Sequence, residues 1–287
     1  MRLDNEQESS NVEDRRGMRM PGGAGGVGIG TIILALAASY FFGVDPSTVI
    51  NVATQFQGSP PAQSVQGHKP PADDENSRFV SKILGSTERT WQEQFQRAGK
   101  KYEDPKLVLF SGATPTACGT GQTAMGPFYC PIDHKVYIDL AFYQELQNRF
   151  HAPGDFAQAY VIAHEVGHHV QNLLGISDKV QQAQQTAHGK GQANALSVRL
   201  ELQADCLAGV WAAKANEARQ ILESGDIEEA LAAATAIGDD RLQKQARGYI
   251  VPDTFTHGSS EQRVRWFKRG IDSGDMNQCN TFQAASL

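Results

Sequence analysis

Residues 157–174 read AQAYVIAHEVGHHVQNLL, and they carry the most informative motif of the chain. The apolar residues recur at helical spacing, so the stretch predicts one buried helix. His164 and His168 are four positions apart, which places both imidazoles on one face of that helix. Two imidazoles in this arrangement bind one zinc ion, and Glu165 lies at the edge of the site. The segment therefore predicts a catalytic metal site, with His164 and His168 as ligands and Glu165 as general base and acid.

A catalytic zinc site needs a third protein ligand. The next histidine, His188, lies in a Gln-rich stretch over residues 181–192 that is predicted to be a loop and is a candidate lid. Further on, Glu201 and Asp205 share one face of a strongly helical run with apolar neighbours. An unpartnered buried carboxylate is costly, so we expect Glu201 to be the third ligand and Asp205 to accept a hydrogen bond from a ligand imidazole. The alternative is an ordinary ion pair with Arg199 or another arginine.

Peptide hydrolysis builds negative charge on an oxygen, and a hydrogen-bond donor is expected to stabilise it. The best candidate is His257, which precedes a helix start in the segment THGSSEQRV. Arg263 lies on that helix and is expected to hold an acid or the edge of the site. Tyr129 and Tyr137 are alternative donors, and a surface position for His257 is the competing interpretation. His169 points about 100° away from His168, so a structural or solvent-facing role is expected for it.

The rest of the chain predicts an α+β domain that is mostly helical, with a small sheet near its start. Residues 107–110 and 135–139 are the clearest strands, and a turn-rich loop separates them. Helices are expected over residues 79–95, with a break at Gly85, and over residues 141–150, 156–174, 193–223, 227–246 and 260–270. An exposed strand edge, supplied by residues 136–139 or 126–129, is expected to align a peptide substrate.

The N-terminal part predicts four successive regions. Residues 1–26 are polar and Gly-rich and predict a disordered cytoplasmic tail. Residues 27–44 are uncharged and apolar, long enough for a single transmembrane helix, with arginines before them. Residues 45–72 form a Pro/Gln/Ser-rich linker, and residues 73–287 form the folded domain. This pattern predicts a single-pass protein of the bacterial inner membrane with its domain outside the cytoplasm; a cleaved signal peptide and a buried helix are the alternatives.

The composition narrows the partners and the redox compartment. A formal net charge of −6 over 287 residues argues against nucleic acid as a partner. The chain has four cysteines, and in an exported domain we expect two disulfides, Cys118–Cys130 and Cys206–Cys279. Four unpaired buried cysteines are the alternative.

These motifs together resemble the bacterial family known as "putative neutral zinc metallopeptidase", whose members are typically single-pass membrane proteins. The resemblance covers nearly the whole chain and includes HEVGHH at residues 164–169, ELQAD at residues 201–205 and HGSSEQRVRWFKRG at residues 257–270. HEVGHH with ELQAD is similar to the gluzincin arrangement, which implies a zincin-like domain with one zinc ion per chain. The segment THGSSEQRV is similar to one in membrane-associated HExxH peptidases, where the His and Arg act at the active site; Gly258 stands where those peptidases have Pro.

The sequence thus predicts a zinc-dependent endopeptidase of the cell envelope that acts on a protein or peptide substrate. The rival hypothesis is a zinc-stabilised, non-catalytic binding or adaptor domain. An intact Glu165 favours catalysis, because a structural zinc site needs no carboxylate at that position.

Overall fold

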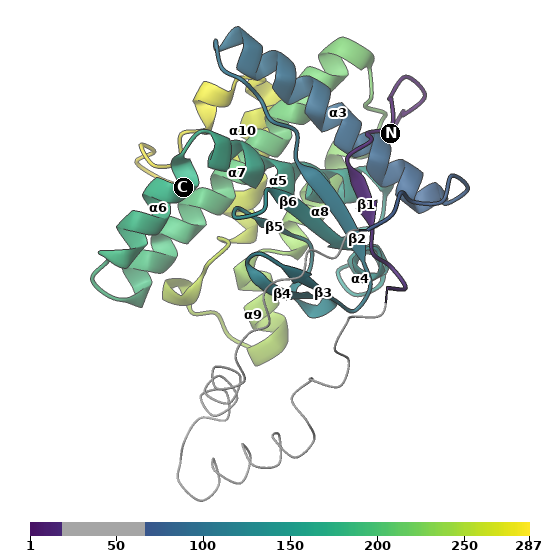
Figure 1. Ribbon diagram of the computed structural model, residues 1–287. Coiled ribbons are helices and arrows are strands. Elements are labelled where there is room, and N and C mark those ends of the chain that lie inside the picture. The colour runs from purple at the N-terminus through teal and green to yellow at the C-terminus, as the bar shows by residue number, and fades with distance from the viewer. Residues whose placement is uncertain (19–66) are drawn as a thin grey trace, which may run out of the picture.

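The computed structural model describes residues 1–18 and 67–287 (Figure 1). These residues form an α+β fold that is mostly helical, as predicted, with 56% helix. The predicted transmembrane stretch, residues 27–44, lies outside the described residues, as does most of the predicted linker. Within the described part of the chain, no helix combines the length and the apolar character that a membrane crossing requires.

The main sheet has four strands in the order β1-β2-β6-β5. Strand β1 (Val12–Asp14) runs parallel to β2 (Lys106–Phe110), and β2 runs parallel to β6 (Lys135–Asp139). Strand β5 (Phe128–Cys130) is antiparallel to β6 and ends the sheet. The loop predicted between β2 and β6 also holds the hairpin β3 (Ala113–Thr116) and β4 (Gly119–Gln122) and a short 3-10 turn, η1 (Thr123–Met125). Both strands predicted from the sequence are confirmed.

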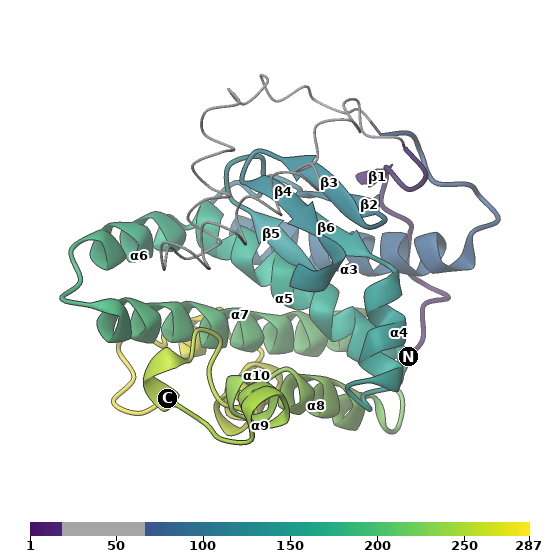
Figure 2. The same cartoon turned by 90° about the horizontal axis from the view of Figure 1, so that it is seen from below.

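Helices cover one face of this sheet and build the rest of the molecule. Figure 2 shows the sheet, α5, α7 and α10 in successive layers, and α5 touches both β5 and β6. The helices are α3 (Glu75–Arg97), α4 (Ala141–Asn148), α5 (Asp155–Leu173), α6 (Ile176–Gln185), α7 (Lys190–Arg219), α8 (Asp226–Ala236), α9 (Asp239–Arg247) and α10 (Ser260–Ser273), with short 3-10 turns η2 (Pro252–Thr254) and η3 (Met276–Cys279).

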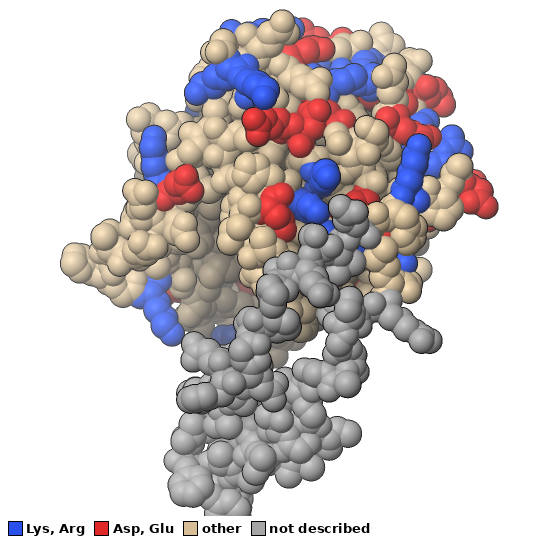
Figure 3. Space-filling model, viewed as in Figure 1, with Lys and Arg blue, Asp and Glu red and all other residues tan. Residues whose placement is uncertain are grey.

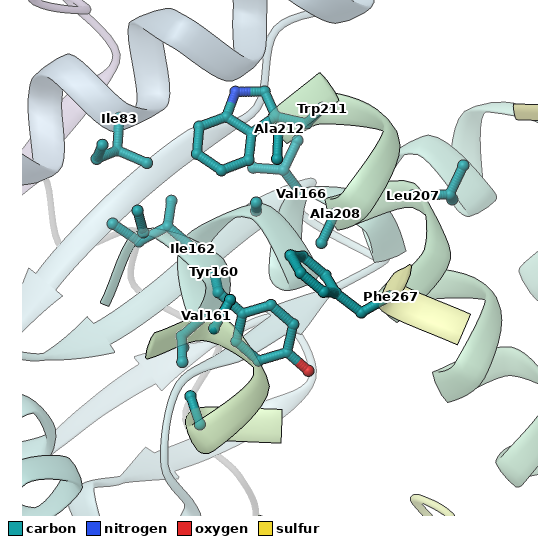
Figure 4. Close-up of a cluster of buried hydrophobic side chains, with 14 of the residues drawn as sticks. Ile83, Tyr160, Val161, Ile162, Val166, Leu207, Ala208, Trp211, Ala212 and Phe267 are labelled. Carbon is teal, nitrogen blue, oxygen red and sulfur yellow. The ribbon is translucent and has the colours of Figure 1, made fainter. Parts of the chain in front are cut away.

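The main core lies where α3, α5, α7 and α10 meet (Figure 4). Trp211 of α7 is fully buried and stacks on Phe156 of α5, with ring centroids 6.0 Å apart. Phe267 of α10 is also fully buried and meets the Tyr160 ring edge-on. This apolar burial fixes α5, the helix that carries the His164 motif, between its neighbours.

Three predictions of local structure are wrong. Helix α3 continues through Gly85 and Ser86, because Gly85 admits the backbone of Gln7 against the helix and Ser86 accepts a hydrogen bond from the Trp211 indole at 3.2 Å. The expected helix over residues 227–246 divides at Gly238 into α8 and α9. The Gln-rich stretch is not simply a loop, since residues 181–185 belong to α6.

The prediction of a disordered tail over residues 1–26 is wrong for its first 18 residues. Residues 12–14 form β1, the outer strand of the main sheet, and Val12 is buried in the core. Low apolar content suggested disorder, but parallel pairing with β2 supplies backbone hydrogen bonds that composition does not reveal. The folded unit therefore includes the N-terminus as well as residues 73–287.

Charged side chains are interspersed on the face of the molecule shown in Figure 3, where lysines and arginines alternate with aspartates and glutamates. This face shows no continuous basic patch among the described residues.

Candidate metal centre

Helices α5 and α7 approach each other closely at the motif. A Cβ atom at Gly167 would lie 3.0 Å from the Ala204 carbonyl oxygen, so a larger residue would push the two helices apart. Because Gly167 precedes His168 and Ala204 lies between Glu201 and Asp205, this contact brings the histidines of α5 to the acids of α7. The glycine inside HEVGH therefore serves the helix packing.

Three side chains converge in the pattern of a metal site. His164, His168 and Glu201 each offer a ligand atom, and these atoms all lie within 4.8 Å of one another. The Glu201 carboxylate oxygens lie 3.2 Å from His164 Nε2 and 3.4 Å from His168 Nε2. Tetrahedral ligands about 2.0–2.1 Å from zinc are about 3.3–3.4 Å apart, so both the spacing and the nitrogen–oxygen donor set fit Zn²⁺.

Hydrogen bonds on the far side of His168 determine its tautomer. The Leu200 carbonyl oxygen can only accept, and it lies 2.7 Å from Gln171 Nε2, which orients the Gln171 amide. Gln171 Oε1 consequently faces His168 Nδ1 at 2.8 Å and accepts a hydrogen bond from its N–H. His168 Nε2 is left with a lone pair that points toward Glu201, as a metal ligand requires. Gln203 extends this chain, because it accepts from Gln171 and donates to the Cys279 carbonyl.

His164 is oriented by a buried carboxylate. Its Nδ1 lies 2.8 Å from Asp205 Oδ1, which leaves Nε2 to face Glu201. Arg263 makes two hydrogen bonds to Asp205, at 2.9 and 2.8 Å, and the Tyr160 hydroxyl donates to the same carboxylate at 2.5 Å. Asp205 therefore contacts the imidazole of His164 and also pairs with an arginine. Arg199 is engaged elsewhere, with the carbonyls of Thr281 and Ala284.

Charge in this buried region favours a bound cation. Burial alone would lower the pKa of His164, but Asp205 and Glu201 raise it to about 10. Burial alone would raise the pKa of Glu201, but the two histidines hold it well below its usual range. Burial raises the pKa of Glu165, so this carboxyl is a better proton acceptor than an exposed glutamate.

The three converging side chains open onto a large cavity. Its volume is about 1040 Å³, and Glu165 lines it together with His164, His168 and Glu201. Its walls come from α4, α5, α6, α7 and α9, and from the 123–131 segment that includes η1 and β5. A cavity of this size gives a ligand access to the three converging side chains.

His257 lines the same cavity, and its side chain is 54% exposed. Its backbone N–H donates to Asp239 Oδ2 at 2.6 Å, and its Nδ1 faces Asp239 Oδ1 at 3.4 Å. This contact with Asp239 raises the pKa of His257 and favours its protonated form, which is a hydrogen-bond donor. Ser259 caps the following helix α10 with a full capping box, which fixes the position of the preceding loop.

The hydroxyls of Tyr129 and Tyr137, the alternative donors, already donate to other groups of the protein. His169 Nε2 lies 2.6 Å from the Glu103 carbonyl and must donate to it, so Nδ1 is the acceptor for the Tyr129 hydroxyl at 2.9 Å. Burial lowers the pKa of His169 to about 4, which keeps this ring neutral near pH 7. Tyr137 donates to Asp133 at 2.7 Å and does not line the cavity. His169 is therefore fully buried, not solvent-facing, and joins α5 to the cavity wall at β5.

Of the two expected substrate edges, only one lies at the edge of the sheet. Residues 136–139 belong to β6, an inner strand between β2 and β5. Phe128 and Tyr129 belong to β5, which ends the sheet and lines the cavity. Asn172 of α5 donates to the Tyr129 hydroxyl at 3.1 Å and holds this strand against the helix.

Both predicted disulfides are confirmed. Cys118–Cys130 joins the β3–β4 hairpin to β5, and Cys206–Cys279 joins α7 to the C-terminal segment. The second bridge begins one residue after Asp205. It also holds the backbone of Cys279, to which Gln203 donates.

Sequence reasoning missed four residues of the site: Tyr160, Gln171, Gln203 and Asp239. Tyr160 precedes His164 by four positions, and Gln171 follows His168 by three, so helical spacing places each beside a ligand. A polar side chain at such a position on a buried helix could have indicated Tyr160 and Gln171 from the sequence. The partner of Gln203 lies on another helix, and no local pattern indicates it.

Comparison with known proteins agrees with this geometry. The sequence profile of the family described as "Putative neutral zinc metallopeptidase" matches residues 1–282. The chain is 53% identical to the uncharacterized protein YpfJ of Escherichia coli K12, over 98% of this chain and 99% of that protein. It is 49% identical to the uncharacterized proteins Mb2605 of Mycobacterium bovis and Rv2575 of Mycobacterium tuberculosis H37Rv, over 65% of each chain. No solved structure matches. The chain therefore belongs to the "Putative neutral zinc metallopeptidase" family.

Proposed function

We propose that the protein is a zinc-dependent endopeptidase with a zincin-like active site. One observation carries the proposal: two imidazoles and one carboxylate at zinc-ligand spacing share a cavity with the carboxyl of Glu165. His164, His168 and Glu201 would hold one zinc ion. When bound, zinc supplies Lewis acidity that polarises a peptide carbonyl and lowers the pKa of water.

The protein side chains then handle the protons and the developing charge. Glu165 takes a proton from the attacking water and delivers it to the leaving amine, a role for which its raised pKa suits it. His257 donates a hydrogen bond to the carbonyl oxygen as negative charge builds there, and Asp239 favours the protonated form. Arg263 acts through Asp205 on the orientation of His164.

The substrate class follows from the shape of the cavity wall. Among the described residues, strand β5 is the last strand of the main sheet and lines the cavity, and an extended peptide can add to it as a further strand. A cavity of about 1040 Å³ also accommodates the side chains of several residues. A protein or peptide substrate fits these features.

The cellular location is also a proposal. Two disulfides support an oxidising compartment outside the bacterial cytoplasm, and the apolar stretch at residues 27–44 supports attachment to the inner membrane. Alkylation of thiols in intact cells, before and after reduction, tests the first point, because a cytoplasmic protein would show four reactive thiols without reductant.

The decisive experiment compares the full-length protein with Glu165→Gln on casein and on a quenched peptide library. We expect the variant to keep one zinc ion per chain by elemental analysis and to lose about 10²–10⁴-fold in kcat/KM. Glu145→Gln is the matched control, because Glu145 lines the same cavity from α4 and pairs with Arg149.

The rival adaptor hypothesis makes the opposite prediction. A zinc-stabilised binding domain would hold zinc equally well in both variants, and Glu165→Gln would match the wild type on every substrate. That result, or a zinc-loaded wild type without peptidase activity, would end the endopeptidase proposal.

A further inference from the structure

The first 18 residues are built into the domain that carries the metal centre. Leu107 N–H donates to the Asn11 carbonyl at 2.9 Å, and Arg15 N–H donates to the Leu109 carbonyl at 2.7 Å. Between these bonds Val12 is 8% exposed and belongs to the main hydrophobic core. The segment thus completes the sheet on the side opposite β5.

Helix α3 supplies a second surface for the same segment. Ser81 Oγ donates to the Ser9 carbonyl at 2.8 Å, and Glu88 accepts from Ser9 Oγ and Asn11 Nδ2 at 2.7 and 2.8 Å. Gly85 meets the Gln7 carbonyl so closely that a Cβ atom there would lie 2.4 Å from it. This fit needs the absence of a side chain on α3, so the packing is specific.

The two chain ends that border residues 19–66 lie side by side. Asp14 and His68 exchange backbone hydrogen bonds of 2.8 and 3.0 Å. The Gly67 N–H donates to Glu13 Oε1 at 2.8 Å, and Arg16 bridges Asp14 and Asp74 with contacts of 2.7 and 2.6 Å. Both ends are thereby fixed at the carboxyl end of β1.

From this packing we infer that residues 1–18 and residues 67–287 occupy the same side of the membrane. Whatever path residues 19–66 follow, it starts and ends at neighbouring points of one folded unit. A single crossing by residues 27–44 would place β1 and β2 in different compartments and break their shared hydrogen bonds. This differs from the arrangement expected from the sequence, in which the tail stays in the cytoplasm while the domain is exported.

Residues 1–18 also contribute to the stability of the domain. Loss of residues 1–18 would leave the outer backbone edge of β2 without hydrogen-bond partners and would expose the surface of α3. We therefore expect it to lower the free energy of unfolding of the domain. The folded unit that carries the candidate metal centre is then residues 1–18 together with 67–287. This conclusion does not depend on the proposed activity.

Crosslinking in cells tests the inference. Glu8 and Arg78 form an exposed ion pair, with Glu8 Oε1 and Arg78 Nε 3.2 Å apart and side chains 47% and 51% exposed. The full-length variant Glu8→Cys/Arg78→Cys carries these two thiols alone, because all four native cysteines form disulfides. A short bismaleimide is added to intact cells, and a specific protease site inserted between residues 45 and 66 is cut after denaturation.

We expect the two fragments to stay joined, in cells as in the purified protein. Glu8→Cys/Lys179→Cys is the control, since Lys179 lies on α6, far from α3 and the N-terminus in Figures 1 and 2. A second pair, Arg2→Cys/Glu223→Cys, replaces another exposed contact of 3.2 Å and guards against a local folding defect. If the two fragments stay joined in the purified protein but separate after crosslinking in cells, the inference is wrong. It is also wrong if the fragments separate in both cases.

Discussion

The buried ion pair between Asp205 and Arg263 yields a quantitative prediction. Asp205 is fully buried and Arg263 is 2% exposed, and they share two hydrogen bonds. Removing one partner leaves the other charge buried without compensation, which typically costs about 3–5 kcal/mol. We therefore expect Asp205→Asn and Arg263→Gln each to lower the free energy of unfolding by that amount.

The double variant distinguishes this reasoning from simple loss of contacts. Once both charges are removed no uncompensated ion remains, so the double variant should lose clearly less than the sum of the single variants. Denaturant unfolding of the four proteins measures the coupling. Glu261→Gln is the control, because the exposed Glu261–Arg265 pair should contribute less than about 1 kcal/mol. Additive losses, within about 0.5 kcal/mol, would refute the argument.

The same substitution also tests the metal centre. An asparagine at position 205 offers His164 Nδ1 a neutral amide oxygen, a weaker acceptor than the carboxylate, so it orients the ring less firmly and makes Nε2 a weaker ligand. We expect zinc affinity to fall about 10–100-fold, measured by competition with a chromophoric chelator. An unchanged zinc affinity in Asp205→Asn would show that Asp205 does not orient His164.

Three further predictions concern other parts of the structure. Tyr129→Phe should leave the buried His169 Nδ1 without its donor, at a cost of about 1–3 kcal/mol by denaturant unfolding, and should shift the cleavage positions that mass spectrometry detects while zinc content stays unchanged. Replacing Cys206 and Cys279 by serine opens a bridge with a sequence separation of 73 and should destabilise the protein by about 4 kcal/mol, visible as a lower unfolding midpoint. Burial would raise the pKa of Glu13, but hydrogen bonds from Arg15, Gly67 and Lys135 lower it to about 2. The stabilising contribution of Glu13 is therefore present above pH 4.5 and is lost as the pH falls toward 2. Protection of the β1 amides against hydrogen exchange should decrease over that window, while the α7 amides stay protected.

Much of the helical framework and of the candidate site was predictable, and the residues explain why. The spacing of His164 and His168, and of Glu201 and Asp205, expresses helix geometry, which acts over four residues and is visible in any single sequence. A buried carboxylate needs a partner, so the sequence predicted that Asp205 contacts an imidazole or an arginine. The helix break expected at Gly85 was wrong, because this glycine makes room for the backbone of Gln7, which is distant along the chain.

Local periodicity thus predicts the helix that carries His164 and His168, the place of Glu165 on it, and the helix that carries Glu201 and Asp205, because each of these depends on neighbours within one or two turns. The tertiary structure alone decides that residues 1–18 join the sheet, that β5 and not β6 is the last strand of the sheet among the described residues, and that Gln171 and Gln203 set the tautomer of His168. Those features depend on hydrogen bonds between residues that are distant along the chain, such as Gln171 with Leu200 and Leu107 with Asn11. Parallel strand pairing and helix–helix contact form such bonds only when the whole core has assembled, so no stretch of the sequence contains them.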